Sequence, residues 1–243
     1  MILTPTQTKT KTLSVSRKEL KFLLSLKDRL YLLNCLNKLL TPDAYGGYNG
    51  YSVRSLYFDS CSNEDYFQKM NKTTHRKRIR LRIYSLEDKK VKFEMKRKSF
   101  GRQLKETISI TREDAIEIMN MNYEVLLKYK SSPLAEYAYD VMTTSNYRPV
   151  SLVQYSRRAF THKDFNTRIT LDNNLIYTDF DYDLFSDKVN FKEALPKDQT
   201  ILEVKYDRFL FSQIQDVLKN CNFVGKPPSK YATSRQLLTS FHY

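Results

Sequence analysis

The 243-residue chain has few of the residues that mark disulfide-rich or membrane-spanning proteins. Its three cysteines, Cys35, Cys61 and Cys221, are an odd number without metal-ligand spacing. Such usage fits a reducing compartment better than a disulfide framework, so we expect a cytoplasmic protein. The N-terminal stretch MILTPTQTKTKTLS lacks the cationic and apolar blocks of a secretory signal. No apolar run approaches the roughly 20 residues that a membrane span needs, so we expect no membrane span.

Several familiar catalytic signatures are also missing. The three histidines, His75, His162 and His242, are not paired with cysteine at zinc-binding spacing. The sequence contains no G-x-S-x-G, Walker A or G-x-G-x-x-G motif. The sequence therefore offers no support for a zinc site, for a serine nucleophile of the G-x-S-x-G type or for a glycine-rich phosphate-binding loop.

Positive charge is what the chain has in excess. It carries 41 Lys and Arg against 27 Asp and Glu, a net charge of +14. This surplus predicts an anionic partner such as nucleic acid, anionic lipid or a phosphorylated metabolite, and it does not choose among them.

Residues 1–13 are mostly Thr, Lys and Gln, which indicates a flexible arm. No repeat or Gly/Pro-rich linker divides residues 14–243, so we expect one domain there.

The hydrophobic pattern predicts an α+β fold dominated by strands. Eight segments show period-2 alternation or β-branched and aromatic enrichment: residues 15–22, 51–59, 76–84, 90–97, 104–110, 151–160, 167–172 and 200–206. Amphipathic helices are expected over residues 25–40, from a capping box at Thr111, and over 134–142 and 211–218. Residues 177–198 are locally acidic, and we expect a solvated connector or an extra strand there. Leu184 and Asn190 stand where a calcium loop needs Gly and Glu.

Residues 76–84, RKRIRLRIY, alternate between cationic and apolar side chains. Because successive side chains of a strand point to opposite faces, one face carries Ile79, Leu81 and Ile83 and the other carries arginines. The same division recurs around residues 14–24, 91–98, 104–110 and 201–207. We therefore predict several strands that present cations on one face and apolar side chains on the other.

Two interpretations of these cationic faces are open. Charged outer faces of antiparallel sheets are common, so the cations could simply be solvated. If they are sheltered, same-face neighbours about 7 Å apart repel by roughly 2 kcal/mol at an effective dielectric of 20, and an anion is needed. The repetition over at least five strands favours the sheltered arrangement.

The acids on these faces appear singly, as Glu19, Glu94 and Glu203. A few carboxylates among many cations suit a phosphate chain with a divalent metal, because Mg²⁺ takes one or two carboxylates and lets phosphate oxygens supply other ligands. An RNA-binding sheet would need exposed aromatics between the cations, and the faces offer chiefly Tyr84. No nucleic-acid partner is therefore expected.

Eight short motifs follow one another along the chain: R-x-E-x-K-F from Arg17, S-L-Y-F-D from Ser55, R-L-R-x-Y from Arg80, F-E-x-K-R-K from Phe93, Y-x-R-x-A-F from Tyr155, R-I-T-L-D from Arg168, L-E-V-K from Leu202 and S-K-Y from Ser229. In this order they resemble the VTC polyphosphate polymerase domain, over residues 14–235. That domain belongs to the CYTH or triphosphate tunnel metalloenzyme superfamily.

The resemblance implies an antiparallel eight-stranded β-barrel, open at both ends, with a basic lumen and helices packed outside. It implies that the chain transfers the γ-phosphoryl group of ATP to inorganic polyphosphate or pyrophosphate with Mn²⁺ or Mg²⁺. The cations expected to act in catalysis are Lys21, Arg80, Arg82, Lys96, Arg157, Arg168, Lys205 and Lys230. Further cations expected to bind the substrate are Arg17, Arg78, Lys98 and Lys105. Glu203 is the expected metal ligand. Glu19 and Glu94 are candidates either as further ligands or as counter-charges.

The chain departs from its relatives in ways that bear on activity. Relatives outside the polymerase branch begin with E-x-E-x-K, and Arg17 replaces the first acid here, which favours polymerase over triphosphatase. No SPX-type region or membrane segment flanks the domain, so polymer export would need a separate membrane partner. Triphosphatase activity on inorganic or nucleoside triphosphates, a non-catalytic polyphosphate-binding module and an RNA-binding sheet stay as alternatives. The oligomeric state is not legible in the sequence.

Overall fold

The computed structural model describes residues 17–225, 227 and 229–239, and the expected arm over residues 1–13 lies outside them. Each of the eight predicted strand segments coincides with one long strand. The long strands are β1 (Arg17–Leu24), β3 (Tyr51–Asp59), β4 (Arg76–Ile83), β5 (Lys90–Ser99), β6 (Arg102–Thr111), β7 (Arg148–His162), β8 (Thr167–Thr178) and β10 (Thr200–Asp207). Three short strands complete the set: β2 (Thr41–Pro42), β9 (Lys192–Glu193) and β11 (Phe223–Gly225).

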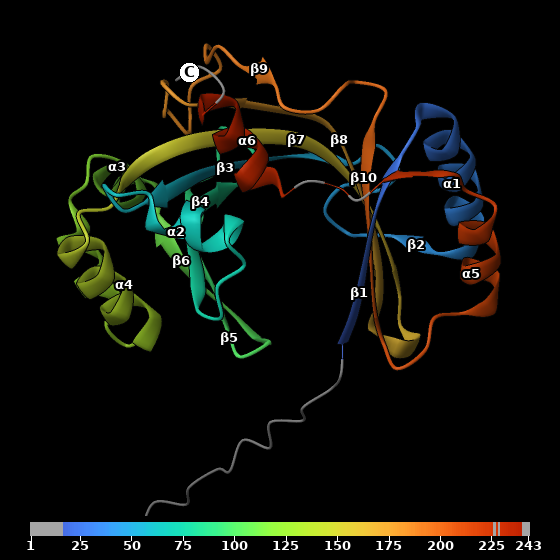
Figure 1. Ribbon diagram of the computed structural model, residues 1–243, viewed down its shortest axis with the longest axis horizontal. Coiled ribbons are helices and arrows are strands. Elements are labelled where there is room, and N and C mark those ends of the chain that lie inside the picture. The colour runs from blue at the N-terminus through green and yellow to red at the C-terminus, as the bar shows by residue number, and fades with distance from the viewer. Residues whose placement is uncertain (1–16, 226, 228, 240–243) are drawn as a thin grey trace, which may run out of the picture.

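All described strands belong to one antiparallel sheet. Its order is β11-β1-β10-β8-β7-β3-β4-β5-β6, with β2 added to β7 and β9 added to β8. Figure 1 shows this sheet bent into an arch, with β5 and β6 at one foot and β1 at the other. Among the described strands no ladder joins β6 to β11 or β1. The α+β class and the large antiparallel sheet are therefore confirmed, whereas a closed barrel is not seen.

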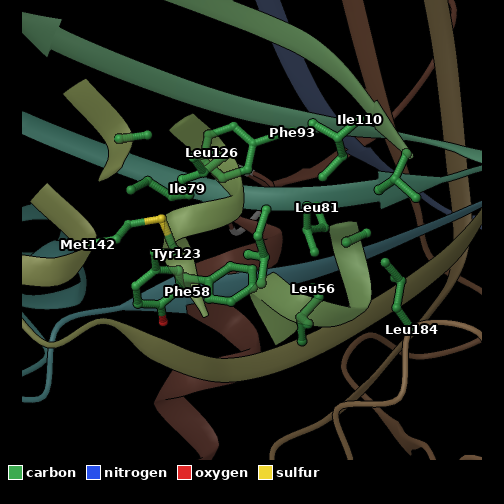
Figure 2. Close-up of a cluster of buried hydrophobic side chains, with 14 of the residues drawn as sticks. Leu56, Phe58, Ile79, Leu81, Phe93, Ile110, Tyr123, Leu126, Met142 and Leu184 are labelled. Atoms are coloured by element: carbon green, nitrogen blue, oxygen red, sulfur yellow. The ribbon is translucent and has the colours of Figure 1, made fainter. Parts of the chain in front are cut away.

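Four helices cover the convex face of the arch, as expected: α1 (Leu26–Leu39), α3 (Arg112–Met119), α4 (Pro133–Thr144) and α5 (Ser212–Lys219). The side chains of Ser25 and Thr111 accept hydrogen bonds from the backbone N–H groups of Asp28 and Asp114, so both helix starts are capped. Figure 2 shows one cluster beneath α4 and the 3₁₀ helix over Tyr123–Tyr129, in which Ile79 and Leu81 of β4 pack with Leu126. These side chains are fully buried.

Two helices depart from the expected arrangement. The sequence did not predict α2 (Glu64–Met70) or α6 (Lys230–Thr239), and both pack on the concave side. There Tyr66 and Tyr231 join Tyr57, Val153 and Tyr155 of the sheet in a third buried cluster. The expectation that all helices lie outside is therefore wrong for these two.

Asp59 joins both concave-side helices to the sheet. Its fully buried carboxylate accepts hydrogen bonds from the backbone N–H groups of Ser60, Asp65 and Tyr66, at the start of α2, and from the hydroxyl of Tyr231 in α6. A buried carboxylate with four donors is well satisfied, which fixes α6 against the end of β3. This contact places Lys230 over the concave face.

Two local expectations also change. The alternation around residues 14–24 places Leu20 on the apolar face of the first strand, but Leu20 is 36% exposed because β1 has only the short β11 beyond it. Residues 177–198 form more than a solvated connector: Leu184 is buried in the convex-side core, and Arg54 holds the carbonyl oxygens of Leu184 and Ser186. The two-residue β9 is the extra strand in this segment. In the described part of the chain, no helix is long and apolar enough to cross a membrane.

Candidate active site

β4 and β5 form one charged wall of the concave face. Cross-strand neighbours on this wall are charged at three successive positions: Arg82 with Lys92, Arg80 with Glu94, and Arg78 with Lys96. β6 adds Lys105 beside Lys96. The intervening Ile79 and Leu81 face the convex core. The alternation in the sequence therefore does separate cations from core residues, and it places the arginines from Arg78 to Arg82 in a row about 13 Å long.

β1, β10 and β8 form the opposite wall. Lys21 lies opposite Glu203, Glu19 lies opposite Lys205, and Lys205 is next to Arg168 in the ladder. The ammonium group of Lys21 is 3.0 Å from Glu19 and 3.3 Å from Glu203. The ammonium group of Lys205 is 2.9 Å from Glu203 and 3.7 Å from Glu19. Two carboxylates and two ammonium groups thus alternate on this wall.

Between the walls lies a cavity of about 540 Å³, within the range of small-molecule sites. Twelve of its lining residues are Lys or Arg, and only Glu94 and Glu203 are acidic. Sequence segments as distant as β1 and α6 contribute to it. Cations thus far outnumber acids among the lining residues, so the cavity suits a polyanion.

The cavity brings together most of the residues predicted for the site. All eight cations predicted to be catalytic line it: Lys21, Arg80, Arg82, Lys96, Arg157, Arg168, Lys205 and Lys230. Arg78, Lys105, Glu203 and Glu94 also line it. Glu19 and Lys98 are not among the lining residues, although Glu19 contacts Lys21 and Lys205 at the edge. The side chain of Arg17 lies outside the described structure. The chemical roles of these residues stay predictions.

Glu94 is held by three cations. It is 2.6 Å from a guanidinium nitrogen of Arg80 and 3.6 Å from one of Arg82, and it also contacts Lys105. Burial alone would raise the pKa of Glu94, but Arg80, Arg82 and Lys105 outweigh it and lower the pKa to about 2. Of the two roles left open for Glu94, this geometry favours a counter-charge that orients the arginines.

We expect Glu94→Gln to remove part of the acid sensitivity of the fold. A carboxylate whose pKa drops from 4.5 to about 2 stabilises the folded state by about 3 kcal/mol above pH 4.5, and this contribution is lost as the pH falls to about 2. Urea unfolding of both proteins between pH 2 and pH 7 measures the difference. The difference in the free energy of unfolding between the two proteins should shrink steadily below pH 4.5. A difference that does not change with pH would contradict the role of Glu94 as a paired counter-charge.

Asp172 organises a second buried cluster. Arg157 donates two hydrogen bonds to its carboxylate, at 2.6 and 2.7 Å, and the ammonium group of Lys230 is 2.7 Å away. Burial would raise the pKa of Asp172, but Lys230 and Arg157 lower it. This carboxylate links β7, β8 and α6 and presents two cations to the cavity. Asp172 ends the R-I-T-L-D motif and was not predicted as a site residue, although Asp172 lies on the same strand face as Arg168.

The resemblance also implies a divalent metal. No group of three or more His, Cys, Asp or Glu side chains among the described residues is arranged to hold one. The two carboxylates Glu203 and Glu19, which share both lysine partners, fit Mg²⁺ or Mn²⁺ that takes its other ligands from phosphate oxygens and water. Burial would raise the pKa of Glu203, but the charges of the nearby Lys21 and Lys205 outweigh burial and lower it. Glu203 is therefore ionised, as a metal ligand must be.

Lys96 lies where the two walls approach. Burial, followed by the charge of Arg78, lowers the pKa of Lys96 to about 8, while Glu19 acts in the opposite direction. The charges of Glu19, Lys21 and Lys205 on the opposite wall also act on Lys96, so the two walls interact electrostatically across the cavity. Lys96 is therefore partly deprotonated near pH 8.

We expect the affinity of the cavity for tripolyphosphate to fall above pH 8 because of Lys96. The anion favours the protonated amine, so the free protein must take up a proton and the Kd rises by up to about tenfold per pH unit. Lys96→Arg stays charged and should lack this term. Calorimetric titration from pH 7 to pH 9.5 measures the ratio of the two Kd values, which cancels the titration of the ligand itself. A ratio independent of pH would contradict the assignment.

Some lining residues were not predicted. Lys92 faces the cavity with Glu94 and Lys96; the alternation around residues 91–98 places it on the cationic face, but it was not among the predicted site residues. Lys69 lies on α2, a helix that was not predicted. The aromatic lining residues are all tyrosines: Tyr45, Tyr51, Tyr57, Tyr84, Tyr155 and Tyr231. The hydroxyl oxygen of Tyr57 accepts a hydrogen bond from the guanidinium group of Arg80 at 3.0 Å.

Comparison with known proteins agrees with this architecture. The family model of the VTC domain matches residues 16–239, nearly the whole chain. A Hippeastrum protein, HpAC1, described as a candidate adenylyl cyclase with a dominant triphosphatase activity, superposes with a TM-score of 0.57 and 13% identity over 90% of this chain and 94% of its own. A candidate adenylate cyclase from Bacillus halodurans superposes with a TM-score of 0.47 and 13% identity, over 88% and 94% of the two chains. No curated protein sequence matches the chain.

Proposed function

Because this chain belongs to the VTC domain family of the triphosphate tunnel superfamily, we propose that it is a polyphosphate polymerase. In this reaction, a terminal oxygen of polyphosphate or pyrophosphate attacks the γ-phosphorus of ATP. A new P–O bond forms, the bond to the β-phosphate oxygen breaks, and ADP leaves. Family membership alone does not specify the phosphoryl donor, the acceptor or the direction of transfer.

One observation supports phosphate over water as the acceptor. A water molecule needs a base or a positioning residue, whereas a terminal phosphate oxygen is already ionised near neutral pH. The two carboxylates that line the cavity, Glu94 and Glu203, have lowered pKa values and are paired with cations, so they are poor bases. Among the described residues that line the cavity, none is a histidine. These features support phosphate over water as the acceptor.

The cations would act mainly by positioning and by neutralising charge. Arg80, Arg82 and Arg157 would bind phosphate oxygens through the guanidinium N–H groups that they do not already donate to Glu94, Ser55 and Asp172, whereas Lys96 and Lys230 act as point charges. Transfer of a phosphoryl group spreads negative charge over its equatorial oxygens, and fixed cations stabilise it without reorganisation. A divalent ion held by Glu203 and Glu19 would supply further charge neutralisation on the phosphates.

We also propose that the phosphate chain closes the arch into a barrel. Lys96 on one wall lies within electrostatic reach of Lys21 and Lys205 on the other, and their like charges oppose a closer approach of the walls, although Glu19 acts in the opposite direction. A polyanion between the walls replaces this repulsion by attraction on both sides. The strand ends that lack a shared ladder in the described structure would then approach each other.

An assay with ATP, Mn²⁺ and a pyrophosphate primer tests the proposed reaction. Gel electrophoresis of the products should show a polymer that lengthens with time, with one ADP released for each phosphate added. Release of orthophosphate without polymer would replace polymerase by triphosphatase as the activity of this cavity. Tight binding without turnover would leave a polyphosphate-binding module.

A further inference from the structure

The six tyrosines of the cavity fall into two groups. Tyr57, Tyr155 and Tyr231 are nearly fully buried and form part of the apolar cluster beneath α6. The rings of Tyr45, Tyr51 and Tyr84 instead lie together, with ring centroids between 5.7 and 6.4 Å apart. Tyr45 is 77% exposed, so a large aromatic surface faces solvent beside the cavity.

This second group, the tyrosine mouth, marks one end of the row of cations. Tyr84 follows Arg80 and Arg82 on the same face of β4, whereas Arg78 lies about 20 Å away toward the other end. Lys92 continues the row into the tyrosines, since its ammonium group is 4.9 Å from the Tyr84 ring and 5.9 Å from the Tyr45 ring. The opposite end has cations such as Arg78, Lys96 and Lys69.

The loop that carries Tyr45 is fixed to the site. Asp43 accepts a hydrogen bond from the backbone N–H of Tyr45 at 3.1 Å, and its other oxygen pairs with Arg168 at 2.8 Å. At the end of the loop, Gly50 has φ +79°, and a side chain there would come within 2.4 Å of the Arg157 carbonyl oxygen. The aromatic platform is therefore held next to two cavity cations before any ligand arrives.

We propose that the tyrosine mouth binds the base of the nucleoside triphosphate substrate. This inference rests on the proposed function, because it requires that the triphosphate occupies the cations. In a nucleotide the base is attached to one end of the phosphate chain, and among the described cavity residues the tyrosine rings that are not buried gather at one end of the cationic row. Bases stack on tyrosine rings whatever their identity. The mouth therefore fixes the orientation of the donor, with the γ-phosphate pointing to the interior.

A split between two ligands tests this inference. Calorimetry would compare a non-hydrolysable ATP analogue with inorganic tripolyphosphate, which has the phosphates but no base. Tyr45→Ala should weaken binding of the analogue about tenfold, the range found for loss of one base–aromatic stack, and leave tripolyphosphate binding within about twofold. Tyr45→Phe retains the ring and should bind both ligands as the wild type does. Tyr48→Ala is the matched control, because Tyr48 is 64% exposed in the same loop and does not line the cavity.

The possible outcomes separate the inference from the proposed function. The inference of a base site is overturned if Tyr45→Ala loses equal affinity for both ligands, or if its affinity for the analogue does not change. Wild-type protein that binds tripolyphosphate but not the analogue overturns the base site and leaves the phosphate site intact. Wild-type protein that binds neither overturns the proposed function and the base site together.

Discussion

Arg80→Ala should lower kcat for polymer synthesis by a factor of about 10²–10³, the usual loss when one preorganised donor to a developing charge is removed. Arg80 lies in the middle of the cationic row, and Glu94 and Tyr57 fix its guanidinium group. Its pKa is raised, because the attraction of Tyr57 and Glu94 outweighs burial, so it is always charged. Stopped-flow or steady-state measurement of ADP release quantifies the effect.

Two controls accompany this experiment. Arg97→Ala removes an arginine from the convex face of β5, where it pairs with Glu106 at 2.5 Å, and it should leave kcat unchanged. Arg80→Lys retains the charge but loses the planar fork, so it should fall between the wild type and Arg80→Ala. Unaltered turnover in folded Arg80→Ala protein would remove Arg80 from the reaction.

Asp172→Asn should have the largest effect on stability, about 3 kcal/mol of the free energy of unfolding, since a buried charge loses its partner. Asp172 is 1% exposed and neutralises both Arg157 and Lys230, whose side chains are 15% and 16% exposed. The asparagine leaves two buried cations in a cavity that already has an excess of them. Urea unfolding at pH 7 without ligand measures the loss.

Tripolyphosphate should restore part of this stability, because it supplies negative charge to the same cations and binds only the folded state. The control is Asp216→Asn, which breaks the exposed pair with Lys219 and should change stability by less than about 0.5 kcal/mol. If Asp172→Asn were no less stable than Asp216→Asn, Asp172 would not be the counter-charge that the structure indicates.

The sequence predicted the strands and their cationic faces because both depend on a local, two-residue period. The row from Arg78 to Tyr84 could be assigned to one face before any coordinates were known. That several such faces converge on one cavity could not follow from periodicity, since it depends on the bend of the sheet and on the order of its strands. The family resemblance supplied that step.

Other features depend on contacts between residues far apart in the sequence. The position of α6 is set by the bond between Tyr231 and Asp59, 172 residues away, and its own sequence has only a weak apolar stripe. The exposure of Leu20 depends on which strand lies beyond β1. The tyrosine mouth joins Tyr45 of a loop to Tyr84, the residue that follows β4, and no local pattern connects them.

A crystal structure with bound tripolyphosphate and Mn²⁺ tests the central claim most directly. The claim is that the cations of the two walls enclose one phosphate chain. The expected result is a chain running along β4, with oxygens in hydrogen-bond contact with Arg80, Arg82, Arg157 and Lys230 and with lysines of the opposite wall. Phosphates bound only on the outer surface, with the cavity cations still paired to Glu94, Glu203 and Asp172 alone, would contradict it.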